Sequence, residues 1–361
     1  MLETSSNIQQ PPVVSWKLSV FIYIDDDKSP AGAESVTDAD LCEARSQVWF
    51  DGCICNGHID VGMDDLKYQL MPIIIEGTRF CPGFLIRSTD PAGKQIQTEF
   101  GIDFLGPVAS RGADILREAG LLEERHTYRY RVVATRLSAD EAAPGRTRRM
   151  RLTEKARPLT FLEMPIAPLL ASVSAVDIGL SDHAYPVFYS TPALAKAQRI
   201  SRKGAACDPG VETGALLAGP LCICPKTRRV FAIVTHVFEF ADSERTPYSL
   251  APSGETWRRI QSEIQEMQAV PATRHHRALG SCHGHNFPVP EGRKSSVFIS
   301  QDDRLWSAAV FSRQPYQLCH IFGADGAGNE DQRLYGMEQG RLRQRGYYVI
   351  PPLAPVVRTQ S

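Results

Sequence analysis

The sequence predicts an α/β fold for the C-terminal half of the chain and an α+β domain before it. The chain has 361 residues, more than a usual single domain, so two domains are the default expectation. Hydrophobic residues make up 43% of the chain and charged residues 22%, ordinary values for a chain that buries a real core. Helical and strand patterns alternate along the second half, as they do in a compact α/β domain.

The first part of the chain predicts a disordered tail and an α+β domain. Residues 1–12 are polar and form the tail, and residues 13–137 form a domain whose fold we do not recognise. Asp114–Glu124 has the pattern of a short amphipathic helix. Four stretches are rich in β-branched and aromatic residues or alternate apolar with basic ones, which predicts strands: Val13–Ile24, Gln47–Phe50, Leu70–Gly77 and Tyr128–Ala134.

Residues 138–172 are interpreted as a basic linker before the second domain. Such a run is most often a solvated connection, and a patch for an acidic partner is the alternative. Its basic residues are Arg146, Arg148, Arg149, Arg151, Lys155 and Arg157.

Residues 173–361 show the clearest helix and strand patterns. Helices are predicted at Pro192–Ile200, Gly254–Gln268 and Asp303–Phe311. Trp257, Ile260, Ile264 and Met267 fall on one face of the second of these. Strands are predicted at Gly214–Pro220, Arg229–Phe240, Arg277–Cys282, Tyr316–Phe322 and Gly346–Ile350, with Cys222–Arg228 turning between the first two.

Composition and charge exclude several classes of protein. The net charge of -1 argues against a protein that mainly binds nucleic acid through phosphates. The nine cysteines are scattered rather than regularly spaced, and the N-terminus lacks a basic region followed by an apolar one, so neither a disulfide scaffold nor a signal peptide is expected. No apolar run is long enough for a bilayer. We therefore expect a cytoplasmic protein with no membrane contact.

Five residues of the second half have the identity and order that a one-zinc peptidase needs. His283 and His285 are two apart in a predicted strand, so both side chains project to one face and can reach one ion. Ser300 and Asp303 stand at the start of a predicted helix, and Glu212 stands just before a predicted strand. Two imidazoles and a carboxylate can bind the metal, and a separate carboxylate can move protons.

These residues resemble the motifs of the JAB/MPN metalloenzyme family, whose peptidases are called JAMM peptidases. The family pattern is a glutamate before a Gly-Leu-Leu-x-Gly-like strand, then His-x-His-Pro, then Ser-x-x-Asp. Here Glu212 precedes Gly214–Gly219, the pair His283–His285 follows, and Ser300–Asp303 completes the set. The resemblance covers residues 183–350 and does not include the N-terminal domain.

The resemblance implies a fold and a chemistry for residues 173–361. The fold would be MPN/JAMM-like, a mixed sheet of the cytidine-deaminase type flanked by helices. One Zn²⁺ per chain would be bound, with water at the open fourth position. Glu212 would act as the general base, and Ser300 would donate a hydrogen bond to the oxyanion. The zinc ligands would be His283, His285 and Asp303.

Alternatives stay open for three of these residues, and the chain departs from the family pattern twice. Ser300 could be a plain helix N-cap, and Glu212 a surface carboxylate. Asp302 is a second possible ligand, although the Ser-x-x-Asp spacing favours Asp303. Asn286 stands where the family usually has proline, and the interval between His285 and the helix is longer than usual, which predicts an inserted surface loop.

The resemblance also implies a substrate class. Active members of the family mostly cut isopeptide or peptide bonds after the C-terminal tail of ubiquitin-like proteins. The chain is therefore expected to be a deubiquitinase-like isopeptidase whose partner is a ubiquitin-like protein or its conjugates. The tail could add as a strand to a sheet edge, with Asp242–Ser253 and Gly323–Gln332 as candidate contact loops. The N-terminal domain would recruit a partner. The alternatives are a non-catalytic MPN-type scaffold and a hydrolase acting on a sulfur-carrier or small peptide.

Other cysteines and histidines fit structural roles better. Cys53–Asp60 contains two thiols, an imidazole and a carboxylate, but a strand and turn with buried cysteines is favoured over a second metal site. Cys222 and Cys224 are expected in the core, and the pair His275–His276 in a basic loop. Cys282 is an unlikely nucleophile because its neighbouring imidazole is expected to bind the metal. No phosphate-binding glycine loop of the nucleotide enzymes occurs.

Overall fold

The computed structural model describes most of the chain as two compact units. The described residues are 15–25, 27–56, 60–123, 126–137, 159–176, 185–311, 314–338 and 340–352. Unit 1 comprises the described residues up to Arg45 and those from Lys67 to residue 137, and unit 2 comprises Ser46–Leu66 and the described residues from 159 onward. Ser46–Leu66, which the sequence analysis placed in the N-terminal domain, thus belong to unit 2. The predicted tail and residues 138–158 of the predicted linker lie outside the described residues.

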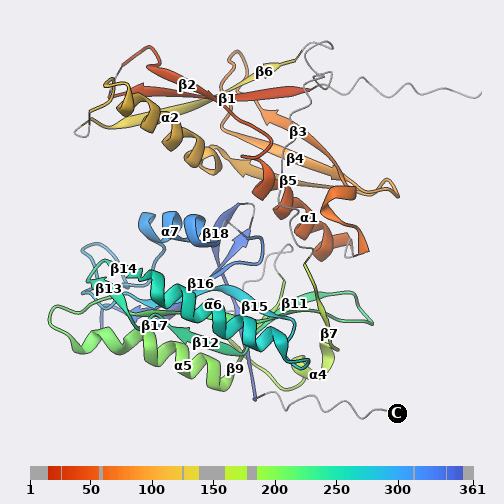
Figure 1. The fold of residues 1–361 in the computed structure, drawn as a ribbon, viewed down its shortest axis with the longest axis vertical. Coiled ribbons are helices and arrows are strands. Elements are labelled where there is room, and N and C mark those ends of the chain that lie inside the picture. Colours follow the sequence, from red (N-terminus) through yellow and green to blue (C-terminus); the bar gives the residue numbers. More distant parts are fainter. Residues whose placement is uncertain are drawn as a thin grey trace, which may run out of the picture. The chain divides into compact units, whose positions relative to one another are not determined.

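Unit 1 consists of two three-stranded antiparallel sheets and a helix (Figure 1). In one sheet β1 lies between β2 and β6, and in the other β4 lies between β3 and β5. Its elements are β1 (Trp16–Ile24), β2 (Gly32–Ser35), β3 (Lys67–Ile73), β4 (Gly83–Thr89), β5 (Gln95–Gly101), the 3₁₀ turn η3 (Ile102–Leu105), α2 (Gly106–Glu118) and β6 (Tyr128–Arg136). Ala113 and Leu116 of α2 pack against Ile22 of β1, because the amphipathic helix buries its apolar face on the sheet.

The prediction of a strand at Gln47–Phe50 is wrong, because these residues lie in the helix α1 (Cys42–Asn56). A short apolar run does not distinguish a strand from a buried helix. Ala44, Val48 and Asp51 are all buried and recur at helical spacing. Cys53, expected in a strand and turn, is buried in the same helix, and His58 of that candidate group lies outside the described residues.

Unit 2 is built on one curled, mixed eleven-stranded sheet, which agrees with the predicted α/β class. The order is β18-β17-β16-β15-β10-β11-β9-β19-β8, and β12 and β7 also pair with β10. The strands are β7 (Leu162–Glu163), β8 (Ser174–Val176), β9 (Val187–Ser190), β10 (Gly214–Ile223), β11 (Val230–Val234), β12 (His236–Glu239), β15 (His276–Gly284), β16 (Leu318–Ala324), β17 (Glu330–Glu338), β18 (Arg341–Arg345) and β19 (Tyr347–Ile350). All ten residues of β10 are buried, as expected for a strand covered on both faces.

Helices pack on this sheet (Figure 1). α5 contacts β9, β10, β15 and β16, and Leu216 and Ala218 of β10 belong to a core cluster with residues of α6 and α7. The helices are α4 (Ala167–Leu170), α5 (Thr191–Arg202), α6 (Gly254–Ala269) and α7 (Gln301–Phe311), with the 3₁₀ turns η2 (Met63–Asp65) and η4 (Lys203–Ala206). The Ser253 hydroxyl caps α6 by accepting from the N–H of Thr256 at 3.1 Å.

The helices predicted at 192–200, 254–268 and 303–311 are confirmed, and so are the strands predicted for this unit, to within a few residues. Two expected loops are structured in part. Asp242–Ser253 contains the hairpin of β13 (Ser243–Thr246) and β14 (Ser249–Pro252), and β17 begins at Glu330 within the stretch expected as the second loop. These strands carry polar side chains, so their pattern is weak.

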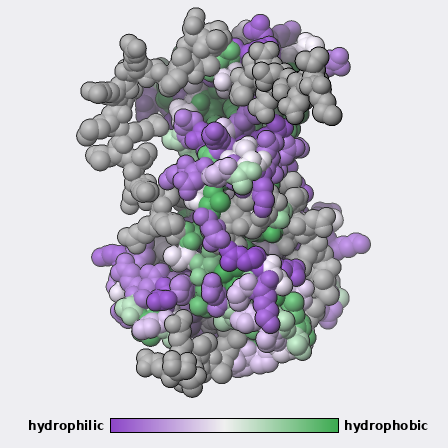
Figure 2. Space-filling model, turned by 90° about the vertical axis from the view of Figure 1, so that its right-hand side faces the viewer, coloured by the Kyte–Doolittle hydropathy of each residue, from purple (hydrophilic) through white to green (hydrophobic). Residues whose placement is uncertain are grey.

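The surface mixes polar and apolar side chains. On the face drawn in Figure 2, hydrophilic side chains alternate with small hydrophobic areas. Among the described residues, no helix combines the length and the apolar character that crossing a bilayer requires.

Replacing Ile260 by alanine should destabilise unit 2 by about 2–5 kcal/mol, because it leaves a cavity in the core beneath α6. Ile260 is 1% exposed and belongs to the cluster of Leu216 and Phe238. The measurement is the free energy of unfolding from urea titration. Gln265→Ala, an exposed position on the same helix, is the control and should change the free energy little.

Candidate metal centre

The two histidines lie where β15 leaves the sheet. His283 pairs with Gly214 of the antiparallel β10 and with Ile321 of the parallel β16. His285 follows the last residue of β15, and its N–H still donates to the carbonyl of Phe322 at 2.8 Å. Because strand side chains alternate, both imidazoles project to the same side of the sheet, as predicted.

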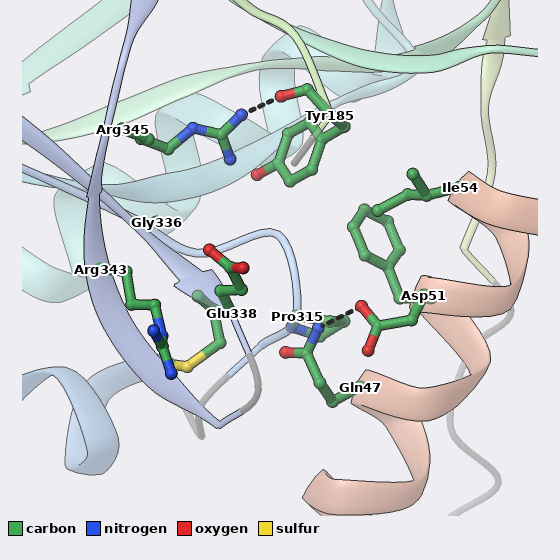
Figure 3. A pocket seen from close by; sticks show the side chains of 11 residues that line it. Gln47, Asp51, Ile54, Tyr185, Pro315, Gly336, Glu338, Arg343 and Arg345 are labelled. Atoms are coloured by element: carbon green, nitrogen blue, oxygen red, sulfur yellow. Dashed lines mark hydrogen bonds between the residues drawn. The ribbon is translucent and has the colours of Figure 1, made fainter. Parts of the chain in front are cut away.

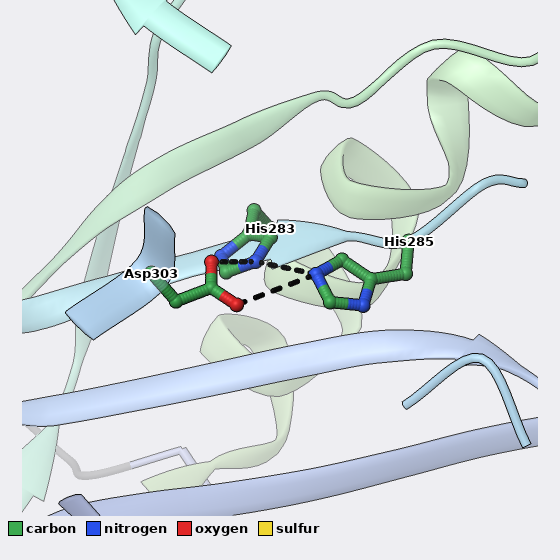
Figure 4. Close-up of side chains that lie close together, drawn as sticks. All are labelled: His283, His285 and Asp303. Carbon is green, nitrogen blue, oxygen red and sulfur yellow. Dashed lines mark hydrogen bonds and ion pairs between the residues drawn. The ribbon is translucent and has the colours of Figure 1, made fainter. Parts of the chain in front are cut away.

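Asp303 reaches both imidazoles from the first turn of α7 (Figure 4). Its Oδ1 lies 2.9 Å from Nε2 of His283, and its Oδ2 lies 3.6 Å from Nε2 of His285. The two Nε2 atoms are 3.1 Å apart. One ligand atom from each residue lies within 4.8 Å of the others. Two imidazole nitrogens and a carboxylate oxygen at this separation could bind one metal ion.

The surroundings orient each imidazole. Nδ1 of His285 is 2.8 Å from the carbonyl of Ser296, and since a carbonyl only accepts, Nδ1 carries the proton and Nε2 is left for a ligand. His283 is oriented by Oδ1 of Asp303 at 2.9 Å, and Cys319 lines the same pocket as His283. Ser296 and Cys319 could not be predicted from the sequence, because nothing in the local pattern places them beside the histidines.

Ser300 and Asp303 form a reciprocal cap at the start of α7. The Ser300 hydroxyl accepts from the N–H of Asp303 at 3.0 Å, and Oδ2 of Asp303 accepts from the N–H and hydroxyl of Ser300 at 2.8 and 2.7 Å. This is the geometry of a capping box with aspartate in the third position. Ser300 is therefore the N-cap of α7, as the alternative expected. In addition, the Ser300 hydroxyl donates to the Asp303 carboxylate and orients it.

Glu212 stands beside the imidazoles, on the segment that leads into β10. It lies two residues before β10, and its Oε1 is 3.9 Å from Nε2 of His285. Its N–H donates to the carbonyl of Thr246 in the β13–β14 hairpin at 2.8 Å. Its side chain is 9% exposed, so the alternative of a surface carboxylate is wrong.

The charges of the cluster shift its pKa values. Burial raises the pKa of Glu212, the neighbouring imidazoles oppose this, and Asp303 and Asp302 add to it. Burial would lower the pKa of His283, but the charge of Asp303 raises it well above the usual value. Burial likewise opposes ionisation of Asp303, and the charge and hydrogen bond of His283 nevertheless lower its pKa. The Asp303 carboxylate therefore favours a positive charge at the imidazoles, which a proton supplies in the metal-free chain.

A pocket opens onto this cluster. Its walls come from β15, β16, the β13–β14 hairpin and α7, together with Glu212 just before β10 and Phe240 just after β12. The exposed Asp302 also lines it, while Asp303 points to the imidazoles. The lining residues are Glu212, Phe240, Tyr248, Ser249, Leu250, Ser281, Cys282, His283, Ser300, Asp302, Asp303, Trp306, Ser307 and Cys319. All the residues predicted for the site except His285 line this pocket, and His285 lies beside it.

A second pocket of unit 2 lies between α1 and the β17–β18 strands (Figure 3). Its polar groups largely pair with each other. Gln47 donates to Asp51 at 2.9 Å, and Arg345 donates to the Tyr185 carbonyl while its guanidinium lies 4.4 Å from the centre of the Tyr185 ring. Within the described ranges, the histidine pair with Asp303 is the one group of three suited to a metal. The second pocket therefore does not compete as a metal site.

Three other predictions for cysteine and histidine have clear outcomes. Cys222 and Cys224 lie in a core cluster with Phe188, as predicted. Burial raises the pKa of Cys282 to about 12, which disfavours a thiolate nucleophile. His276 is not in a basic loop, because it begins β15 and is buried.

Comparisons with known proteins do not assign the chain to a family. No family model matches it, and no curated protein matches it. Similar solved structures include a solution structure of a protein from Desulfitobacterium hafniense, with 11% identity and a TM-score of 0.29, covering 46% of this chain and 94% of that one. Another is a Salinibacter ruber protein in solution, with 18% identity and a TM-score of 0.29, covering 46% of this chain and 95% of that one. Neither likeness informs the function.

Zinc binding should depend on Asp303 and not on Asp302. We expect about one zinc per chain in the wild type, and a loss of zinc in His283→Ala and Asp303→Ala. Asp302→Ala is the matched control and should retain the metal. The measurement is the metal content of purified protein, with circular dichroism as a check of folding. Retention of zinc in Asp303→Ala together with its loss in Asp302→Ala would assign the ligand to Asp302.

Zinc affinity should decrease as the pH falls. His283 has a raised pKa, so below that pKa a proton occupies the nitrogen that the metal needs and must be released on binding. The apparent Kd should rise about tenfold for each pH unit below this pKa and level off above it. Competition with a chromophoric chelator across the neutral range measures this dependence. An affinity that is constant across that range would exclude His283 as a ligand.

Proposed function

We propose that this chain is a zinc-dependent JAMM-type peptidase that hydrolyses the amide bond after the C-terminus of a ubiquitin-like protein. The convergence of His283, His285 and Asp303 around one point, with Glu212 beside them, is the observation that carries the proposal. These residues are spread over a long stretch of sequence, and they come together at one pocket. The mixed sheet with packed helices supports an MPN fold for residues 173–361 as part of the same proposal.

The donor set fits a catalytic zinc ion better than a structural one. His283, His285 and Asp303 would provide three ligands, which leaves the fourth position of a tetrahedral site for water. When bound, the metal supplies a Lewis acid and lowers the pKa of its water towards about 7.

Glu212 would move the protons. Its carboxylate is close enough to the imidazoles to accept a proton from a water held between them, as a general base. Attack of that water on the amide carbonyl forms a C–O bond, the C–N bond then breaks, and Glu212 returns the proton to the leaving amine. Its raised pKa suits a group that must both accept and donate a proton near neutral pH.

Ser300 would support the reaction in two ways. It orients Asp303 through the cap, and its hydroxyl lines the pocket. With the carboxylate engaged as a ligand, the hydroxyl proton can turn to the oxyanion that forms during amide hydrolysis. This second contribution is the one that the resemblance implies.

The β13–β14 hairpin supports an extended substrate. Among the described residues β14 pairs with β13 and with no other strand, and Ser249 and Leu250 of β14 line the pocket. An incoming C-terminal tail could therefore add as a strand beside β14 and bring its last carbonyl to the cluster. Tyr248 at the tip of the hairpin is 70% exposed and is available to the folded part of such a partner. Unit 1 would recruit a further partner protein.

Glu212→Gln should keep about one zinc and lose turnover by roughly 10²–10⁴-fold, because the amide cannot accept the proton. The measurement is the initial rate of cleavage of a ubiquitin-like fusion, together with the metal content. Glu263→Gln, at a partly exposed site on α6, is the control and should retain full activity. Full activity in Glu212→Gln would refute the proposed base.

Incubating the wild type with a panel of ubiquitin-like fusions, with and without a chelator, tests the substrate class. Cleavage that stops with the chelator and returns with added zinc supports the proposal. If the chain binds zinc but cleaves no fusion, the proposed peptidase function is contradicted and the non-catalytic scaffold is favoured. Cleavage of only a sulfur-carrier or small peptide substrate favours the small-substrate hydrolase.

A further inference from the structure

Asn286 immediately follows the second histidine, and its side-chain amide donates two hydrogen bonds to the backbone of two other segments. Its Nδ2 donates to the carbonyl of Ser201 at 2.9 Å and to the carbonyl of Val211 at 2.9 Å. Ser201 lies in the last turn of α5, and Val211 immediately precedes Glu212. Because both partners can only accept, the nitrogen of the amide must face them.

The segment around Glu212 is fastened on each side. The carbonyl of Val211 accepts from Asn286, and the carbonyl of Thr213 accepts from the N–H of Gly284 at 2.9 Å. Between them the N–H of Glu212 donates to the Thr246 carbonyl at 2.8 Å. Asn286 and Gly284 flank His285. The stretch that carries this histidine therefore hydrogen-bonds to both neighbours of Glu212, Val211 and Thr213.

Three glycines allow the chain to pack closely around Asn286: Gly204 and Gly284 beside its amide, and Gly210 beside its backbone carbonyl. A Cβ at Gly204 would lie 2.0 Å from the Val211 carbonyl oxygen and 3.1 Å from Nδ2 of Asn286. A Cβ at Gly210 would lie 2.2 Å from the Asn286 carbonyl oxygen, and one at Gly284 would lie 1.8 Å from the Ser201 carbonyl oxygen. Such distances are far below van der Waals contact, so the backbone is packed closely around the Asn286 side chain.

We propose that Asn286 is a positioning residue that fixes the carboxylate of Glu212 relative to the histidine pair. A proline at this position, as in the family pattern, would leave the Ser201 and Val211 carbonyls without these donors. In this chain the asparagine amide connects the general base to the metal-binding strand. The catalytic effect of Asn286 rests on the proposed function. Its effect on the backbone of Glu212 does not depend on that function.

The experiment compares Asn286→Asp, which keeps the size and removes both donors, with Asn286→Ala. Asn329→Ala is the matched control, since the Asn329 amide donates to Asp325 in an exposed turn and contacts neither Glu212 nor the histidines. Hydrogen exchange of the Glu212 amide in the metal-free chain should become at least about tenfold faster in both Asn286 variants. It should not change in the control.

In zinc-loaded protein, kcat for fusion cleavage should fall about a hundredfold in both variants, with KM and zinc content nearly unchanged. In a Glu212→Gln background, Asn286→Ala should cause no further loss, because the residue acts through Glu212. Unchanged exchange at Glu212, or losses that multiply in the double variant, would overturn the proposal. So would loss of cooperative unfolding in both variants, which would make Asn286 a residue of the fold alone.

Failure of the proposed function gives a different result. Zinc-loaded wild type would then cleave no fusion, while hydrogen exchange would still decide whether Asn286 holds the Glu212 segment.

Discussion

The antiparallel pairing of β10 with β15 is the constraint on which the centre depends. The pair Gly214–His283 sets the distance between the Glu212 segment and the histidines, and the register shifts at Leu217–Ala218, opposite Gly280. Gly280 has a φ of +147°, and a Cβ there would lie 1.9 Å from the Leu318 carbonyl oxygen. Without this glycine the irregularity could not form, and a slip by one residue would turn His283 towards α5.

Much of the fold of unit 2 follows from local pattern. The apolar face of α6 and the buried run of β10 were predictable because periodicity and burial agree there. The helix at Gln47–Phe50 was not predictable, because its apolar run suits a strand as well as a helix and the packing of α1 decides between them. The polar strands β17 and β18 have almost no pattern of their own and are held by pairing with β16 and each other.

The convergence of the three candidate ligands could be predicted from the sequence, but the groups that support them could not. His283, His285 and Asp303 carry the chemistry in their residue types, and spacing selected Asp303 over Asp302. The carbonyl of Ser296 has no signature in sequence, because every residue has a carbonyl and only the fold determines which one meets His285. The sequence did single out Asn286, because it replaces the proline of the family pattern. Its partners Ser201 and Val211 can be identified only from the structure.

The cap that Ser300 and Asp303 share links the start of a helix to the chemistry of the cluster. The Asp303 carboxylate closes the first turn of α7 and also faces both imidazoles. A change at this residue therefore alters the start of the helix and the geometry of the cluster together. Replacing Asp303 by alanine would remove both the carboxylate that faces the imidazoles and the acceptor that closes the first turn of α7. The position is therefore doubly constrained, whereas a substitution of Glu212 leaves the start of α7 intact.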